Sequence, residues 1–216
     1  MSTVKILVTR PEHDDVVNYL SSRSNEILLF AKEKGVTFKD LGAEKVTRKE
    51  FEKIIKNTLP SFVLFNGHGN SDRILGHNDE PIVIESENEE LLRGKIVYAV
   101  SCHAGASLGV AMVKKGCITF IGYKDKFAFL TDNNHECTPE EDELAKWFKE
   151  ASNEVPHALI KGNSTQIAYD KSQRKYKELI SKFSSSNAIL EAASIRFWMF
   201  WNMQNQVIIG SEDAKI

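Results

Sequence analysis

The chain has 216 residues, 42% of them hydrophobic and 27% charged, which is typical of one globular domain with a full core. A formal net charge of -2 gives no general attraction to nucleic acid or anionic lipid, and no stretch is long and apolar enough to span a membrane. Because the three cysteines lack CxxC spacing and the first residues enter a strand pattern without signal-peptide organisation, we expect a single cytoplasmic domain over residues 1–216, without disulfides or a thiolate zinc site.

The first half of the chain alternates buried strands with helices. Apolar runs predict strands at 4–9, within 61–69, within 95–105 and at 118–122, and a brief extended piece at 35–38. Helices are predicted at 14–21, 47–56, 87–93 and 106–115, with acidic residues near the start of the first and a Thr47–Glu50 capping box on the second. Residues 26–30 fit either a helix or a strand. The alternation predicts an α/β fold: a largely parallel sheet with helices on both faces.

The second half is mainly helical. Residues 124–137 have no periodicity and are predicted to form a loop. Thr138 then has the features of an N-cap, with Pro139 at the first helical position and acidic residues in the first turn. Further helices are predicted over 158–183 and 187–203, and 206–210 (QVIIG) reads as a last strand at or near a sheet edge.

Two of the predicted strands end at reactive side chains. The run SFVLFNGHG ends at His68-Gly69, and KIVYAVSCHAG ends at Cys102 and the turn that follows it. Because parallel strands present their carboxyl ends along one edge of the sheet, we expect His68 and Cys102 to lie side by side there, although they are 34 residues apart in sequence. A cysteine facing a histidine is the minimum arrangement for thiol nucleophilic catalysis.

The expected chemistry is acyl transfer. A free cysteine titrates at about pH 8.5, and a position at a helix N-terminus beside a histidine is expected to lower the pKa of Cys102. His68 could take up the thiol proton and later protonate the leaving amine. The backbone amides of Gly69 and Cys102 are the candidate oxyanion donors, since Gly69 has no β-carbon and lets a carbonyl come close.

The blocks FVLFNGHG and IVYAVSCHAG resemble the catalytic motifs of the caspase-fold (clan CD) cysteine peptidases, the group of caspases, metacaspases, gingipains, separases and CHAT proteases. SCHAG is similar to the metacaspase cysteine motif, residues 104–125 to the CHAT segment after its cysteine, and VIIGSED to the gingipain and CHAT ending. The resemblance implies a three-layer caspase-like fold and a hydrolase, a thiol protease, that cleaves peptide bonds with His68 and Cys102 through a thioester acyl-enzyme. It implies a protein or peptide substrate, no cofactor and no metal.

The resemblance also bears on specificity, where this chain departs from the family. The caspase QAC(R/Q/G)G signature is absent, and Val100 stands where metacaspases carry an aspartate that binds a basic P1 side chain. Asp125 or Asp132 could supply that charge instead. Arg10, just after the first strand, is at the approximate position of a caspase arginine that recognises an acidic P1 residue. We expect the loop 124–137 to gate activity, with a regulatory protein as a further partner.

Two other functions remain open. A caspase-fold module without catalysis would act as a binding partner, which Val100 favours. A small-molecule or nucleotide-binding α/β protein would use the same sheet edge, although NGHGN and GASLG match neither a Walker nor a Rossmann fingerprint. Metal ligation by His77 and His103 together with His68 and Cys102 is not supported by the spacing of these residues.

Overall fold

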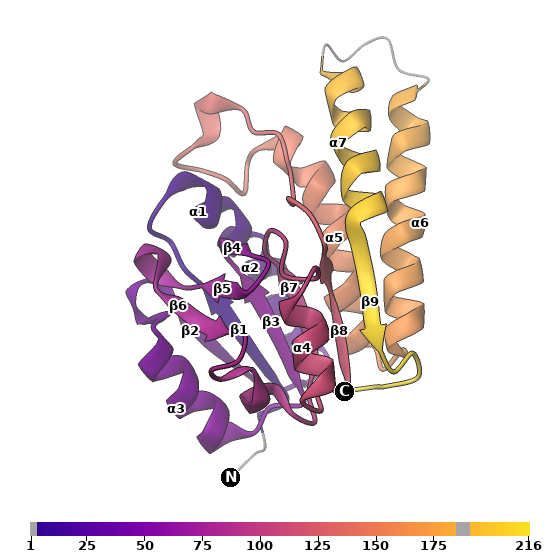
Figure 1. Cartoon of the computed structure of the whole chain (residues 1–216). Helices are drawn as coiled ribbons and strands as arrows, with labels where there is room; N and C mark the ends of the chain where they lie inside the picture. The colour runs from indigo at the N-terminus through magenta and orange to yellow at the C-terminus, as the bar shows by residue number, and fades with distance from the viewer. Residues whose placement is uncertain (1–3, 185–190) are drawn as a thin grey trace.

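A six-stranded sheet forms the centre of the computed structural model, which describes residues 4–184 and 191–216 (Figure 1). The strand order is β2-β1-β3-β7-β8-β9, and every neighbouring pair is parallel except β8 and β9. The strands are β1 (Ile6–Arg10), β2 (Phe38–Gly42), β3 (Phe62–Asn66), β7 (Ile96–Val100), β8 (Thr119–Tyr123) and β9 (Gln206–Gly210). The predicted α/β class, the mostly parallel sheet and the edge position of the last strand are confirmed.

Helices cover both faces of this sheet, so the molecule has three layers (Figure 1). They are α1 (Asp15–Ser22), α2 (Ser24–Glu33), α3 (Arg48–Thr58), α4 (Leu108–Lys114), α5 (Glu143–Ile160), α6 (Thr165–Ser184) and α7 (Ala192–Asn205). Alternate residues of each strand enter two separate cores, as the twofold side-chain period of a strand requires. On one face Leu64 packs with α1, α2, α5 and α6, while on the other Phe65 packs with α3 and α4.

A second, small sheet follows β3 directly. It consists of β4 (Gly69–Asn70), β5 (Arg73–Leu75) and β6 (Pro81–Ile84), all antiparallel. The sequence analysis did not predict these strands, because each has only two to four residues and shows no clear period. They place Gly69 in a hydrogen-bonded strand immediately after His68, so the turn at the end of β3 is held from both sides.

Several helix starts and ends follow the predicted capping chemistry. The Thr47 side chain accepts a hydrogen bond from the Glu50 amide, and Asp14 accepts one from Val17. Residues 26–30, left undecided above, belong to helix α2. The predicted extended piece at 35–38 is displaced, since β2 begins only at Phe38. Residues 87–93 contain a short 3-10 turn, η3 (Glu89–Leu92), rather than an α-helix.

The predicted helix start at Thr138 is wrong. Helix α5 begins at Glu143, and its N-cap is Asp142, whose buried carboxylate accepts hydrogen bonds from the amides of Leu144 and Ala145. Several acidic residues precede the apolar stripe of this helix, so its sequence is compatible with more than one N-terminal residue. Tertiary contacts determine which of them is the N-cap. The predicted helix 158–183 is divided at Gly162, which has a φ of +79° and lies between α5 and α6. Of the predicted helix 187–203, residues 187–190 lie outside the described residues.

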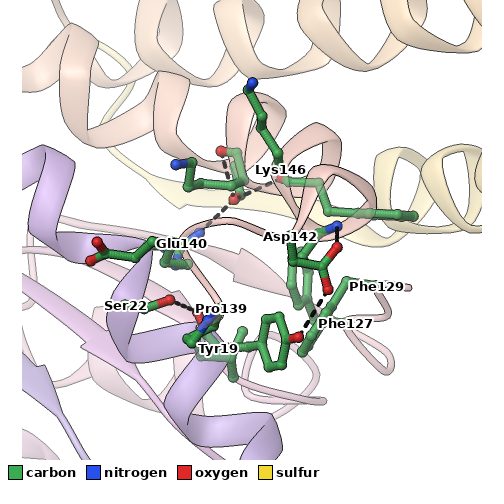
Figure 2. A pocket seen from close by; sticks show the side chains of 14 residues that line it. Tyr19, Ser22, Phe127, Phe129, Pro139, Glu140, Asp142 and Lys146 are labelled. Atoms are coloured by element: carbon green, nitrogen blue, oxygen red, sulfur yellow. Dashed lines mark hydrogen bonds between the residues drawn. The ribbon is translucent and has the colours of Figure 1, made fainter. Parts of the chain in front are cut away.

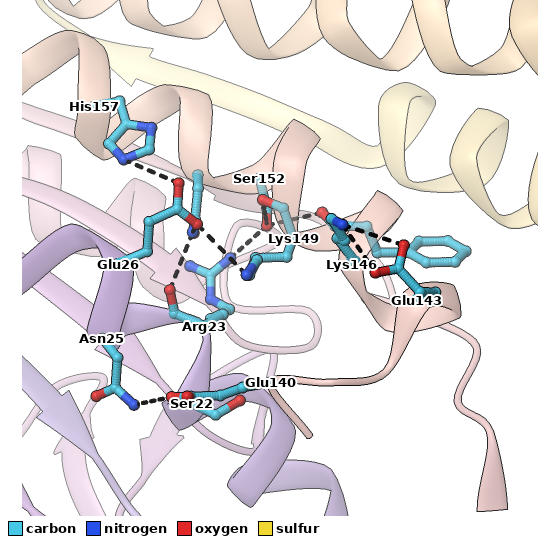
Figure 3. Close-up of polar contacts among 12 residues, drawn as sticks. Ser22, Arg23, Asn25, Glu26, Glu140, Glu143, Lys146, Lys149, Ser152 and His157 are labelled. Atoms are coloured by element: carbon cyan, nitrogen blue, oxygen red, sulfur yellow. Dashed lines mark hydrogen bonds and ion pairs between the residues drawn. The ribbon is translucent and has the colours of Figure 1, made fainter. Parts of the chain in front are cut away.

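Polar contacts join the α1–α2 corner to α5 (Figure 3). The buried Arg23 guanidinium donates to Ser152 on α5, and Glu26 on α2 lies 3.5 Å from His157 and 3.6 Å from Lys149. These contacts fix the helical layer beside the carboxyl ends of β1 and β3. Within the described residues, no helix has the length and apolar character needed to cross a bilayer.

Replacing Asp142 with alanine should destabilise the fold strongly. The carboxylate caps α5 and also accepts from the Tyr19 hydroxyl at 2.9 Å and the Asp132 amide at 2.8 Å, so its loss leaves several donors unpaired. We expect the free energy of unfolding in urea to fall by about 2 kcal/mol or more. Asp132→Ala is the matched control, because Asp132 caps only the three-residue turn η4 (Asn133–His135), and it should change stability by less than about 0.5 kcal/mol. Equal effects of the two substitutions would contradict this account.

Candidate active site

His68 and Cys102 occupy matching positions on neighbouring strands. Strand β3 pairs with β7 in a register that places Asn66 opposite Val100, and each reactive residue follows two positions later. The two turns touch: the Ser101 hydroxyl donates a 2.9 Å hydrogen bond to the carbonyl oxygen of His68. The adjacency predicted from the sequence is therefore confirmed at the level of the backbone, and both side chains are partly exposed.

Gly69 makes this close contact possible. A β-carbon at this position would overlap the Ser101 hydroxyl, and it would lie 2.9 Å from the Arg73 carbonyl oxygen and 3.4 Å from that of Cys102. Contacts this short exclude any side chain without a shift of the backbone. Glycine is thus required here to bring the two turns together, and it leaves the backbone of the first turn uncovered toward Cys102.

Asp14 is the residue that the sequence analysis missed. Its Oδ2 lies 2.8 Å from Nε2 of His68, while its Oδ1 accepts a 2.9 Å hydrogen bond from the Val17 amide. Burial opposes ionisation, but the Val17 amide and the His68 imidazole together hold the pKa of Asp14 below its ordinary value. The sequence indicated Asp14 only as one of two acidic residues near the start of a helix, because the strand adjacency that brings it to His68 spans 54 residues.

The environment of Cys102 differs from the expected one. Burial raises the pKa of the Cys102 thiol and Asp125 adds to this, while the Phe127 backbone and Lys126 act in the opposite direction. The prediction of a lowered pKa is wrong, because burial of the thiol is the largest influence on this pKa. Helix α4 begins only at Leu108, so Cys102 is not at its N-terminus. The sulfur lies 4.0 Å from the Phe127 carbonyl oxygen.

The turn after Cys102 is held by the end of β8. His103 has a left-handed backbone with a φ of 60°, a conformation that few non-glycine residues adopt. Its amide donates to the Asp125 carbonyl at 3.1 Å, and the Gly105 amide donates to that of Tyr123 at 2.9 Å. These bonds fix the turn that carries Cys102 against the carboxyl end of β8.

The four residues proposed for substrate specificity are placed as follows. The Arg10 guanidinium forms a two-pronged ion pair with Asp40 and also donates to Asn25, so its charge is already paired within the protein. Val100 is fully buried in the core. The Asp125 carboxylate accepts from the Lys126 amide and lies 3.6 Å from His103, and Asp132 caps the turn η4. Of these four residues, Asp125 acts on Cys102 by raising its pKa, and its carboxylate already contacts His103 and the Lys126 amide.

Two hollows border the site on the side of Phe127. A cavity of about 510 Å³ is lined by Asp15 and Val16 of α1, by residues 126–131 and by Trp198 of α7. Figure 2 shows the neighbouring pocket, in which Tyr19, Phe127 and Phe129 form an apolar wall and Asp142 reaches the Tyr19 hydroxyl. His68 and Cys102 do not themselves line the larger cavity, but two of its lining residues lie next to the site: Asp15 follows Asp14 in the chain, and Phe127 carries the carbonyl oxygen 4.0 Å from the Cys102 sulfur.

The first part of the loop 124–137 is anchored to α7. The Asn202 side chain bonds both the amide and the carbonyl of Ala128, and the Trp201 indole donates to the Lys126 carbonyl at 2.9 Å. The predicted loop is confirmed, since residues 124–137 contain no strand and no helix apart from the 3-10 turn η4, and these bonds give its first part a defined position beside Cys102.

Comparisons with known proteins identify the fold. No family model matches the chain, and no curated protein matches it. Among solved structures, the complex of Porphyromonas gingivalis RgpB pro- and mature domains matches with a TM-score of 0.64 at 11% identity, over 97% of this chain and 47% of that chain. The Arg-specific cysteine proteinase gingipain R (RGPB) matches with a TM-score of 0.62 at 11% identity, over 98% and 47%. An inactive zymogen C11 protease from Parabacteroides distasonis matches with a TM-score of 0.42 at 12% identity, over 82% and 64%.

The chain spans about half the length of the two gingipain chains. At this level of identity the match concerns the fold, and it agrees with the resemblance found in the motifs around His68 and Cys102. The chain has the caspase-like α/β fold that gingipain R shares with the clan CD cysteine peptidases.

Proposed function

We propose that this protein is a cysteine endopeptidase in which Cys102 is the nucleophile, His68 the general base and acid, and Asp14 the residue that orients the imidazole. The observation that carries the proposal is the contact of the two turns, with the His68 ring held by Asp14 at 2.8 Å. A nucleophile, a base and a group that orients the base are the parts that acyl transfer requires. The caspase-like fold supports the assignment.

The geometry suggests which ring nitrogen reacts. Because Nε2 of His68 is bound to Asp14, Nδ1 is the atom left for the thiol. The raised pKa of Cys102 means that the resting thiol keeps its proton at neutral pH. As the sulfur attacks the peptide carbonyl, its proton passes to Nδ1, and the imidazolium is stabilised by the Asp14 carboxylate. The same proton then goes to the leaving amine, and water hydrolyses the thioester.

The oxyanion of this reaction would be bound by backbone amides. Gly69 and Cys102 remain the candidates, since the missing β-carbon at Gly69 leaves room for the substrate carbonyl beside Cys102. The cavity of about 510 Å³ between α1 and residues 126–131 is the proposed binding site for a substrate side chain. Its lining combines aromatic and aliphatic side chains with the charged Asp15, Lys126 and Glu136, which favours a protein or peptide side chain that is apolar along its length and polar at its tip.

Cleavage of a mixed peptide library should depend on both reactive side chains. Cys102→Ala should abolish cleavage, because no other described group can form the thioester at this edge. His68→Ala should lower kcat/KM by a factor on the order of 10² or more, through loss of proton transfer. Cys117→Ala is the matched control, since Cys117 is a buried core thiol beside Lys95, and activity should persist. Equal activity of Cys102→Ala and the unmodified protein would reject the peptidase proposal.

Asp14→Asn should reduce kcat much more than KM. An amide at this position can no longer stabilise the imidazolium, although the cap to Val17 can persist, so we expect kcat to fall on the order of 10²-fold. The folded pKa of Asp14 is lowered, so its contribution to stability is present above its ordinary pKa of 3.8 and is lost as the pH falls below it. The stability difference between Asp14→Asn and the unmodified protein should therefore shrink in acid, which urea unfolding at several pH values can measure. A difference that grows in acid would contradict the assigned charge.

Alkylation by iodoacetamide should distinguish the proposed neutral thiol from a preformed thiolate. The exposed Cys137 provides a reference within the same molecule. Because burial raises the pKa of Cys102 above that of a free thiol, we expect Cys102 to be modified more slowly than Cys137 at pH 7, and its rate to keep rising beyond pH 9. Peptide mass spectrometry after timed quenching separates the two sites. Faster modification of Cys102 at pH 7 would show a thiolate activated before the substrate binds.

A binding module without catalysis is the second candidate. Two observations favour it: the partly buried Cys102 thiol has a raised pKa, and the fully buried Val100 stands in place of an acidic residue that would bind a basic P1 side chain. Slow alkylation of Cys102 together with no library cleavage would support this alternative.

A further inference from the structure

A cluster of histidines and carboxylates surrounds His13, next to His68. His13, His68 and His77 have their rings edge to face, with centroids 6.0 Å apart for His13 and His68 and 5.3 Å for His13 and His77. Two carboxylates, those of Asp14 and Asp79, reach the same place. The proposed mechanism uses only His68 and Asp14, and it leaves His13 without a role.

Three atoms of this cluster have the spacing of a metal site. Nε2 of His68 lies 2.8 Å from Oδ2 of Asp14, and Nε2 of His13 lies 3.6 Å from the same oxygen. One ligand atom from each of the three residues falls within 4.8 Å of the others. Ligands bound to a tetrahedral zinc ion at about 2.0–2.1 Å are separated by about 3.3–3.4 Å. The separations of 2.8 Å and 3.6 Å lie on either side of this value, so small side-chain movements suffice.

The condition of His13 points independently to a ligand. Its side chain is only 10% exposed, and among the described residues neither ring nitrogen makes a hydrogen bond. Nε2 lies 3.3 Å from Asp79 Oδ1, but without hydrogen-bond geometry. A buried polar atom without a partner is unfavourable and calls for an explanation such as an ion. A cation between His13, Asp14 and His68 would supply a partner for the His13 imidazole.

We propose that His13, Asp14 and His68 bind a Zn²⁺ ion. Two imidazoles and one carboxylate are a ligand set that suits zinc and leaves a fourth position open. Asp79, beside His13, can fill that position directly or hold a water molecule in it. Asp14 is prepared for the role because its second oxygen is fixed by the Val17 amide. The spacing rules applied to the sequence do not reveal such a site, since its ligands come from two segments that are far apart.

Zinc binding at this site would inhibit the enzyme, a consequence that rests on the proposed peptidase function. The ion replaces the proton on Nε2 of His68 and takes the oxygen of Asp14 that orients the ring. The imidazole then has a cation where catalysis needs an anion, so it can no longer accept the Cys102 proton. The same aspartate thus serves two states, one active and one bound to metal.

Binding is tested in the full chain with Cys102→Ala, so that no thiolate at this edge contributes and no peptidase activity is needed. Isothermal titration with Zn²⁺ and visible absorption with Co²⁺ should show one equivalent bound. His13→Gln in this background should weaken binding by at least tenfold. His103→Gln is the matched control, because His103 lies beside Cys102 and Asp125 and not in the cluster, and it should leave the affinity unchanged.

A second measurement needs no substitution, in case His13→Gln perturbs folding. Diethyl pyrocarbonate modifies accessible histidines, and mass spectrometry should show that Zn²⁺ protects His68 while His103 and His135 still react. Absence of binding to Cys102→Ala protein, undiminished binding to His13→Gln or no protection of His68 would each overturn the site. Inhibition is measured separately, as the ratio of library cleavage with and without Zn²⁺. Metal binding without inhibition would overturn the regulatory consequence alone, and absence of cleavage would count against the peptidase proposal and not against the metal site.

Discussion

The candidate site depends on one carboxylate that accepts from two donors. Asp14 binds the Val17 amide through one oxygen and the His68 imidazole through the other. The first bond fixes the start of α1, and the second fixes a side chain two residues beyond the end of β3. This is possible only because β1 and β3 are neighbours in the sheet, so that the loop after β1 passes beside the turn after β3. The strand order therefore determines the chemistry that can occur at this edge.

A buried polar network also fixes the carboxyl ends of β1 and β3. The Asn66 side chain, two residues before His68, accepts from Arg23 at 3.0 Å and donates to the Thr9 carbonyl and to Ser24. Arg23 continues to Ser152 on α5, so the helical layer and two strands share one set of hydrogen bonds. Buried polar groups that satisfy one another favour a single arrangement. The position of His68 is consequently tied to the packing of α5, far along the chain.

Local chemistry explains what the sequence could predict. The apolar runs located every strand of the large sheet except the true extent of β2, and the caps at Asp14 and Thr47 follow from side-chain hydrogen bonds within a few residues. The adjacency of His68 and Cys102 followed from parallel pairing alone. Roles that depend on tertiary contacts could not be predicted from the sequence. Asp142 rather than Thr138 is the N-cap of α5, because the Tyr19 hydroxyl and the Asp132 amide also donate to the Asp142 carboxylate. The raised pKa of Cys102 likewise depends on burial by a segment that sequence patterns describe only as a loop.

The antiparallel last strand sets the direction in which the polypeptide leaves the sheet. Because Tyr123 of β8 pairs with Gln206 and Thr119 with Gly210, β9 runs away from the edge that carries His68 and Cys102. Its continuation bonds to the start of α6, where the Thr165 amide donates to the Ala214 carbonyl at 3.0 Å (Figure 1). A fluorophore, an affinity handle or a tether to a sensor chip attached after Ile216 would therefore stand at the opposite pole of the molecule, and would leave the approach of a bulky polypeptide unobstructed.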